Sequence, residues 1–429
     1  MAEVTEFRGV RYNLEKIRSM ADVICPPYDI ISPGEQATLY ARDEHNTVRL
    51  EHAVEMPGDN EKNNKYIRSR DTFNKWLKDR VLVQDMVASY YVHEHSFEMG
   101  EAKKKRIGLF ACARLEPWEN RVIFPHEFTI SGVKAERLKL MQACATNFSP
   151  IFGLYEDPGG KVNQTIISRL KSNPDYSFAH NGESHRFWAV NEPEFVQRVS
   201  HFLAPKTIYI ADGHHRYETA LAYRDYRRQL NPHGSSNDAY NFVMLTLVSF
   251  SDPGIVVLPI HRLVRGISVE TLKKFRKEMG TYFEVTEVPA DTVSISGKVA
   301  GSIKLYGLEK GKILFLKLLP KIKLNDIMAE KRSDAYCKLD VSIVQHIIVE
   351  KLLGLPAGDT DNLAYTPSSE SACSLVESGQ FQFAILLNPV PATTIKTIAD
   401  ANDRMPRKST FFYPKLPSGL VIFRLEGTI

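Results

Sequence analysis

Five consecutive residues carry the side chains best suited to chemistry in this chain: Asp212, Gly213, His214, His215 and Arg216. The run before them, 207–211, is mostly apolar and favours a strand, and apolar residues recur at helical spacing over 217–221. The five residues are therefore predicted to form the turn between a strand and a helix. The first N–H groups of a helix have no intrahelical partner and lie at the positive end of its dipole, so they can bind an anion.

The side chains of this turn indicate that the anion is a phosphate. Arg216 can bind two phosphate oxygens at once, and His214 and His215 can donate hydrogen bonds or transfer a proton near neutral pH. Gly213 allows a ligand to approach the backbone closely, and Asp212 is a residue type that caps helix N-termini. Cations in the first turn oppose the helix dipole unless an anion compensates them. An ordinary helix start with its basic side chains in solvent is the alternative.

Acidic candidates for catalysis occur at three further places, Asp29, Glu35 and Glu127. Each could bind a metal ion or accept the proton of an attacking hydroxyl, and the sequence does not divide these roles among them. Asp29 follows two prolines, which make a rigid turn and a well-defined platform. An ordinary loop at the end of a strand is the alternative for that segment.

Basic candidates accompany them. Lys134 and Arg137 share a helical face at i, i+3, although a solvated charged face would look the same. Lys408 and Ser409 are followed by a threonine, as in a Walker motif, but the Gly-x-x-x-x-Gly spacing is absent, so the segment is not a P-loop. Lys408 could still bring a cation to the site.

Resident metal sites are less favoured by the sequence. His214 or His215 with Glu218 lacks the His-Glu-x-x-His pattern of zinc proteases. His93 and His95 point to one face of a predicted strand, where we expect a simple pair rather than a metal site.

Helical and strand signals interleave along the chain without a repeat, which predicts a mixed α/β protein. A soft boundary is expected near residue 235, between a region 1–235 that contains a β-rich insertion at about 86–200 and a C-terminal α+β region, 236–429, that completes the pocket. A helix over 339–355 is expected to be capped by Asp340 or Ser342. The other helices are predicted at 34–42, 61–80, 133–145 and 268–280, and strands at 87–99, 106–116, 148–157, 241–250, 254–264, 381–390 and twice within 409–425.

Composition restricts the classes of function. The chain has 429 residues, of which 43% are apolar and 25% charged, with a formal net charge of +4. It has no basic tail, so a nucleic-acid partner is not favoured, although a local basic patch remains open. Five scattered cysteines without a Cys-x-x-Cys pair, and no apolar run of membrane-spanning length, lead us to expect a cytoplasmic protein without a membrane span. The oligomeric state is not set by the sequence.

The string DGHHRYETAL at 212–221 resembles the signature of the family catalogued as domain of unknown function 1015. It also resembles the wider ParB/sulfiredoxin-like superfamily, mainly in the early block and in the turn at 212–216. The family resemblance covers essentially the whole chain. It continues through 25–35, 46–51, 126–129 with Lys134 and Arg137, 147–155, 258–264 and 405–421.

The resemblance implies a ParB/sulfiredoxin-like nucleotide-binding core whose Gly-His-Arg turn holds nucleotide phosphates. Superfamily members include CTP-hydrolysing DNA clamps, a free serine kinase and sulfiredoxin. His214 stands where sulfiredoxin has its cysteine, and strands rather than a helix-turn-helix are predicted after Leu230. We therefore expect phosphoryl transfer from ATP, ADP or CTP, with Mg²⁺, to a small hydroxylated metabolite. A ParB-like nucleotide-hydrolysing switch or partition-type protein is the alternative, and a catalytically silent ligand binder also stays open.

Overall fold

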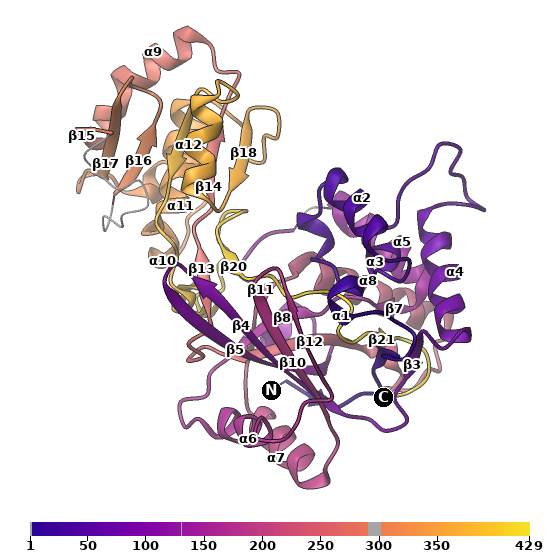
Figure 1. Ribbon diagram of the computed structural model, residues 1–429. Helices are drawn as coiled ribbons and strands as arrows, with labels where there is room; N and C mark the ends of the chain where they lie inside the picture. Colours follow the sequence, from indigo (N-terminus) through magenta and orange to yellow (C-terminus); the bar gives the residue numbers. More distant parts are fainter. Residues whose placement is uncertain (1, 130, 291–301) are drawn as a thin grey trace. The chain divides into compact units, whose positions relative to one another are not determined.

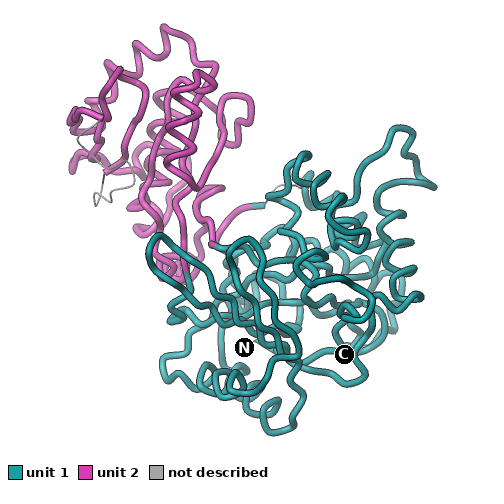
Figure 2. Tube along the Cα trace, viewed as in Figure 1, with its two compact units in different colours: residues 1–125, 129–255, 414–429 teal, residues 126–128, 256–413 magenta. Residues whose placement is uncertain are grey.

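The computed structural model describes residues 2–129, 131–290 and 302–429, which form two compact units (Figure 2). The first unit consists of Met1–Pro125, Thr129–Ile255 and Pro414–Ile429, and the second of His126–Phe128 and Val256–Tyr413. Residue 235, where a boundary was expected, lies within the first unit, between a long helix and a central strand. The division into regions 1–235 and 236–429 therefore stays a prediction.

The first unit is built on a 9-stranded sheet (Figure 1). Its strands follow the order β6-β11-β8-β12-β5-β4-β10-β9, and β1 also pairs with β5. Residues 86–200, expected as an insertion, supply much of this sheet. The strands are β1 (Val4–Thr5), β4 (Tyr90–Met99), β5 (Ala102–Arg114), β6 (Ile123–Phe124), β8 (Ile151–Tyr155), β9 (Tyr176–His180), β10 (Glu183–Val190), β11 (Ile208–Asp212) and β12 (Phe242–Ser249).

The centre of the sheet follows from its apolar strands. Every residue of β12 is buried, and β12 lies between β5 and β8, as a continuous apolar run predicts for a strand covered on both faces. The predicted strands at 87–99, 106–116 and 241–250 are confirmed. The turn expected over 100–105 is wrong in length, because β5 already starts at Ala102 and the lysines 103–105 belong to it. Lys103 pairs with Glu98 across the hairpin, so opposite charges support this pairing.

Helices cover the sheet of the first unit. α4 (Lys65–Lys78) packs on α5 (Ser131–Cys144), and α5 packs on α8 (His214–Leu230), which also contacts β8 and β12. These helices and α2 (Pro33–Arg42) confirm the helical predictions for the first unit. A helical pair that the sequence did not indicate, α6 (Lys161–Arg169) and α7 (Pro193–Leu203), packs together elsewhere. The short elements are α1 (Met20–Val23), η1 (Tyr28–Ile30), α3 (Val48–Glu51), β2 (Val10–Tyr12) and β3 (Leu82–Gln84).

The last segment of the chain, Pro414–Ile429, belongs to the first unit. Its strand β21 (Phe423–Arg424) pairs with β7 (Thr146–Asn147), and Ser418 bridges to Cys25 near the N-terminus. Six of its apolar side chains are buried, so this segment is part of the core rather than a tail: Leu416, Leu420, Val421, Ile422, Phe423 and Leu425.

The second unit contains a 6-stranded sheet in the order β15-β17-β16-β19-β14-β18 and a two-stranded pair, β13 (Val256–Leu258) with β20 (Phe411–Tyr413). The helix predicted at 268–280 is confirmed as α9 (Val269–Glu278), and Ser268 caps it by accepting a hydrogen bond from the Thr271 N–H. The sheet strands are β14 (His261–Val264), β15 (Phe283–Pro289), β16 (Ile303–Tyr306), β17 (Lys312–Leu318), β18 (Leu363–Thr366) and β19 (Phe383–Leu386), and the other helices are α10 (Asp334–Cys337), α12 (Ser369–Glu377) and α13 (Ala392–Asp400).

The helix predicted over 339–355 differs in two respects. α11 (Asp340–Ile343) runs directly into a π-helical segment, η6 (Val344–Leu352), and the N-cap is Leu339 rather than Asp340 or Ser342. The carboxylate of Asp340 instead accepts a hydrogen bond from the side chain of Asn388, 3.1 Å away. A competing long-range partner thus displaced the local cap.

The expected mixed α/β fold is confirmed in both units, whereas the ParB/sulfiredoxin-like core stays a prediction. The described helices include none with both the length and the apolar character needed to cross a membrane.

Candidate functional site

The turn between β11 and α8 is built around Gly213. Gly213 is the N-cap residue of α8 and has a φ of 95°, in the left-handed region that favours glycine. A Cβ at this position would lie 2.9 Å from Nε of Arg216, because the Arg216 side chain folds back over the turn. Asp212 was predicted as a capping residue, and this is wrong: it is the last residue of β11. Its carboxylate binds two cations instead.

Asp212 joins Arg216 and Lys415 in a charged triad. Arg216 donates to Oδ2 of Asp212 at 2.6 Å, and Nζ of Lys415 donates to Oδ1 at 2.6 Å. Arg216 also donates to the carbonyl oxygen of Pro150. Burial opposes ionisation of Asp212, but Lys415 and Arg216 outweigh it and hold the pKa of this carboxyl well below its usual range.

A cavity of about 40 Å³ lies beside the turn, and Arg216, Arg137 and Glu51 line it. Arg137 of α5 donates to the carbonyl oxygen of Glu51 at 3.0 Å and lies 3.3 Å from its carboxylate. The hydroxyl of Ser149 donates to the same carboxylate at 3.1 Å. The guanidinium of Arg137 also stacks over the ring of Tyr28, 4.0 Å from its centroid. Two arginines from different helices thus meet at one cavity.

Burial is the largest influence on the pKa of two groups that contact Arg137, namely Glu51 and Tyr28. Burial raises the pKa of Glu51, while Arg137 and Arg216 oppose that shift. Burial likewise raises the pKa of Tyr28 to about 12, so its hydroxyl keeps its proton at neutral pH.

Two buried polar atoms at the cavity lack a partner. Within residues 2–129, 131–290 and 302–429, Nε of Arg137 and Oγ1 of Thr219 make no hydrogen bond. Arg137 is 7% exposed and Thr219 1%. Buried polar groups are normally satisfied, so these atoms indicate a site for a polar ligand or for water.

The structure brings Asp29 toward this cavity and leaves Glu35 apart from it. Asp29, in η1, is exposed and interacts electrostatically with both Arg216 and Glu51. Glu35 is exposed in the first turn of α2, where its N–H donates to the Ser32 hydroxyl at 3.2 Å. The negative charge of Glu35 helps to raise the pKa of the buried Cys25 thiol.

The other predicted residues of the first unit lie on or near α8. His214 is buried and helps to lower the pKa of Asp212, and His215 is half-buried. Lys134 was expected beside Arg137 as a phosphate ligand. Its ammonium group forms an ion pair with Glu218 at 2.7 Å, so its charge is already compensated.

Three predicted residues belong to the second unit, where the structure brings them together. The backbone N–H of Lys408 donates to Oε1 of Glu127 at 3.2 Å. Ser409 is buried, and its hydroxyl donates to the carbonyl oxygen of Pro406. Their part in a site of the first unit stays a prediction.

Sequence reasoning did not single out Glu51, Ser149 or Lys415. Each lies in a segment that carries the family resemblance, and a charged residue within such a segment was the available signal for Glu51 and Lys415. Neither local periodicity nor turn chemistry indicates that these residues contact Arg137 or Asp212.

A second, larger cavity of about 460 Å³ lies elsewhere in the first unit. It is lined by Arg70, Arg227 and Arg424, together with Tyr223 and Tyr226. Arg227 is held by the Tyr223 hydroxyl, and Arg424 by Glu426. Its three arginines make this cavity a second candidate for binding an anion.

Comparison with solved structures finds distant likenesses. A free serine kinase variant in complex with AMP has a TM-score of 0.36 and 12% identity, covering 71% of this chain and 87% of that chain. A conserved hypothetical protein from Pyrococcus furiosus has a TM-score of 0.34 and 13% identity, covering 72% of this chain and 93% of that chain. SbnI with a C-terminal truncation, from Staphylococcus aureus, has a TM-score of 0.34 and 11% identity, covering 72% and 84%. Similarities this distant carry no argument about function, which has to be inferred from the residues of the chain itself.

The search of curated proteins gave no match. A family model, by contrast, matches residues 4–342, which is most of the chain. The chain belongs to the family described as protein of unknown function (DUF1015).

Proposed function

We propose that this protein binds a nucleotide by its terminal phosphate at the cavity beside Gly213 and transfers that phosphoryl group to a small hydroxylated metabolite. The observation that carries the proposal is that Arg137 of α5 and Arg216 of α8 line one cavity, together with Thr219 of α8. Paired guanidinium groups favour an anion.

The size of the cavity limits what it can hold. At about 40 Å³ it has room for a few water-sized groups, which suits one phosphoryl group and excludes a whole nucleotide. The base and sugar would therefore lie outside it. ATP, ADP and CTP stay equivalent candidates, because the cavity would contact only the phosphate.

The acidic residues of the site would hold the arginines in place. Asp212 and the Pro150 carbonyl orient Arg216, and Glu51 orients Arg137. Donors that are fixed before the ligand arrives need no reorganisation when charge develops in the transition state. A bound phosphate would use donors that remain, among them Nε of Arg137, which makes no hydrogen bond within the described part of the chain.

In the proposed reaction, the substrate hydroxyl oxygen attacks the terminal phosphorus. A new O–P bond forms while the P–O bond to the nucleotide breaks, and the hydroxyl proton passes to a carboxylate. Asp29 is our first choice for that base because it is exposed and interacts with Arg216. His214 and His215 are further proton carriers, and Glu35 and Glu127 are alternative bases.

Mg²⁺ fits the chemistry of these residues. Mg²⁺ prefers carboxylate and phosphate oxygens, and Asp29 is the exposed carboxylate near the cavity. When bound, the ion would supply charge neutralisation on the phosphates. Lys134 would contact the phosphate only by leaving its ion pair with Glu218, and the phosphate-binding roles of Lys408 and Ser409 stay predictions from the sequence.

A thermal-shift screen of nucleotides with Mg²⁺ tests the proposal, because a ligand that binds the native state raises the apparent stability. Arg216→Ala should weaken the binding of the best nucleotide at least about tenfold, since hydrogen bonds to charged groups contribute roughly 1.5–3 kcal/mol. Arg224→Ala is the matched control. Arg224 is a buried arginine of the same helix whose guanidinium donates to the Leu115 carbonyl at 2.9 Å. Equal shifts in wild type and Arg216→Ala would refute the assignment.

The acceptor is tested separately, by following nucleotide consumption. Consumption that requires an added hydroxylated amino acid or similar metabolite is the expected result. Phosphate release without an acceptor, accelerated by DNA, would instead favour the nucleotide-hydrolysing switch.

A further inference from the structure

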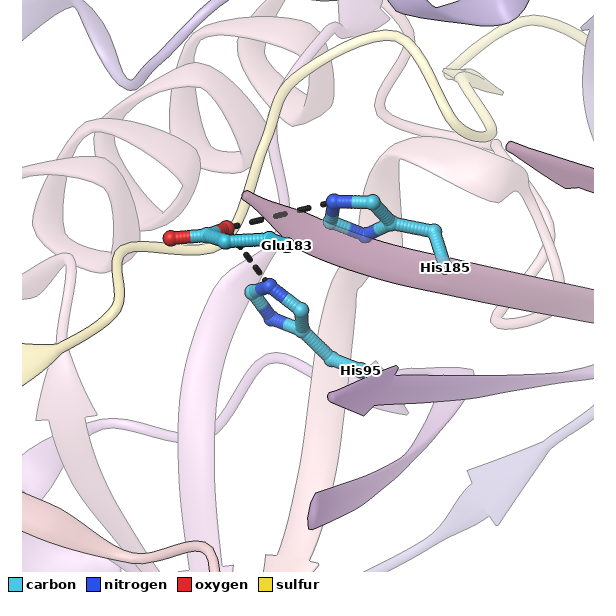
Figure 3. Close-up of side chains that lie close together, drawn as sticks. All are labelled: His95, Glu183 and His185. Atoms are coloured by element: carbon cyan, nitrogen blue, oxygen red, sulfur yellow. Dashed lines mark hydrogen bonds and ion pairs between the residues drawn. The ribbon is translucent and has the colours of Figure 1, made fainter. Parts of the chain in front are cut away.

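A second cluster of polar side chains lies in the first unit, on the neighbouring strands β4 and β10 (Figure 3). These strands pair antiparallel, and His185 of β10 lies opposite His95 of β4. Side chains two residues apart on a strand point to the same face, so Glu183 joins both histidines on that face. Histidine and carboxylate groups in such an arrangement are the ligands of many metal sites.

The three side chains lie at distances that suit a shared ion. Oε2 of Glu183 lies 2.7 Å from Nε2 of His95 and 3.9 Å from Nε2 of His185. One ligand atom from each residue lies within 4.8 Å of the other two. Zn²⁺ binds nitrogen and oxygen ligands at about 2.0–2.2 Å, so small side-chain movements would bring all three atoms to one ion.

His185 supplies an independent observation. Its Nε2 atom is buried and makes no hydrogen bond to any residue that the structure describes, although the side chain is only 2% exposed. Figure 3 shows this ring facing Glu183, whose side chain is 23% exposed and gives access from solvent. A buried ring nitrogen that faces a carboxylate but makes no hydrogen bond to a described residue indicates a missing ligand.

The surroundings orient His185 as metal sites require. Nε2 of His93 lies 3.0 Å from Nδ1 of His185. With Nδ1 of His185 as the donor and His93 as the acceptor, the lone pair of His185 Nε2 faces Glu183. Such a partner on the other ring nitrogen is usual for metal-binding histidines. Phe178 stacks on His185 with ring centroids 4.6 Å apart and fixes the plane of the ring.

Arg106 sets a limit on this site. It donates to Nδ1 of His95 at 3.2 Å and to the Pro414 carbonyl at 2.9 Å. His95 then carries its proton on Nε2 and donates it to Glu183. Coordination through Nε2 requires that proton to move to Nδ1 and requires Arg106 to keep only its bond to Pro414. A nearby guanidinium also repels a cation, so we expect moderate rather than very tight binding.

We propose that His95, Glu183 and His185 form a binding site for a divalent transition-metal ion of the Zn²⁺ type, with two imidazole nitrogens and one carboxylate oxygen as ligands. Three protein ligands leave a fourth position for water or a substrate, as in zinc sites that bind or activate small molecules. This site uses none of the residues of the proposed nucleotide site, so either proposal can fail without the other.

Titration of the chelator-treated full chain with Co²⁺, followed by its visible d–d absorption, tests the site, and Zn²⁺ should displace the Co²⁺. One ion per chain is expected. Glu183→Gln keeps the size of a partly exposed side chain and should weaken binding at least tenfold. His185→Phe keeps an aromatic ring in the stack and should abolish the absorption. His233→Ala removes an exposed histidine and should leave binding unchanged.

Circular dichroism shows whether each variant folds. If His185→Phe does not fold, the metal affinity of Glu183→Gln alone tests the proposed site. The proposal is overturned if wild type gives no saturable Co²⁺ absorption. It is also overturned if Glu183→Gln binds as tightly as wild type, or if His233→Ala is the variant that loses the ion.

Discussion

Asp212 is the residue on which the geometry of the candidate site depends most, because it holds Arg216 and Lys415 together. Asp212→Asn would leave two largely buried cations with a weaker partner. Breaking a buried ion pair in this way typically lowers stability by about 3–5 kcal/mol. We expect a loss near the lower end of that range in chemical denaturation at pH 7, since the Asp212 side chain is 20% exposed.

The pH dependence of that loss follows from the depressed pKa of Asp212. A carboxyl with a lower pKa in the folded than in the unfolded state stabilises the fold above its unfolded pKa, about 3.9, and ceases to do so as the pH falls through the folded value. The stability difference between wild type and Asp212→Asn should therefore be largest above about pH 5 and shrink below pH 4. A difference that stays constant from pH 7 to pH 3 would show that the charge of Asp212 does not matter.

Removing the negative charge of Glu51 tests how the net charge of the cavity affects phosphate binding. Glu51→Gln removes a negative charge beside Arg137 but keeps a side chain that can accept from Ser149. A more positive cavity should bind phosphate roughly three- to tenfold more tightly, as Coulomb's law requires for a charge removed at a few ångströms. Isothermal titration with the best nucleotide measures this. Weaker binding by Glu51→Gln would place Glu51 among the ligands rather than among the counter-charges.

At the scale of elements, the turn between β11 and α8 depends on Gly213. Gly213→Ala would strain a backbone with a φ of 95° and would push its methyl group against Arg216. Gly58→Ala is a suitable control, since Gly58 has a φ of 88° but no atom within 4 Å of the position that an added methyl group would occupy. Both variants should lose about 1–2 kcal/mol through strain, but only Gly213→Ala should also lose nucleotide binding. If the two variants bound the nucleotide equally well, the turn at Gly213 would not be part of the nucleotide site.

The same turn shows what a sequence can predict. β11 and α8 were foreseeable because their signals are local: a short apolar run, a glycine, and a helical repeat. The N-cap residue was not predicted correctly, because Asp212 binds Lys415, which lies 203 residues away in the sequence. Such long-range contacts leave no periodic pattern in the sequence. Glu51 and His185 were missed for the same reason. Strands β9 and β10 were missed because β9 has only 5 residues and the first half of β10, residues 183–186, is polar.

At the scale of the whole molecule, the C-terminal segment completes the first unit. It contributes β21, Lys415 and the six buried apolar side chains between Leu416 and Leu425. Burying an apolar side chain contributes roughly 1.5–3 kcal/mol, so removing six would cost about 10 kcal/mol or more, as much as the stability of a typical domain. A chain that ends at residue 413 should therefore not fold cooperatively.

A chain that ends at residue 426 is the control for that truncation. It keeps Lys415 and the buried side chains and loses only the last three residues. It should melt cooperatively, close to the full chain, in a calorimetric scan. A cooperative transition of normal size in the chain ending at residue 413 would contradict the role of this segment in the first unit.

Phosphate binding between Arg137 and Arg216 underlies the whole proposed function, and a crystal structure with Mg²⁺ and the most stabilising nucleotide would reveal it. We expect a phosphate oxygen within about 3.2 Å of a guanidinium nitrogen of Arg216 and of Arg137. Phosphates bound instead in the larger cavity, at Arg70, Arg227 and Arg424, with Arg216 still held only by Asp212 and Pro150, would contradict it.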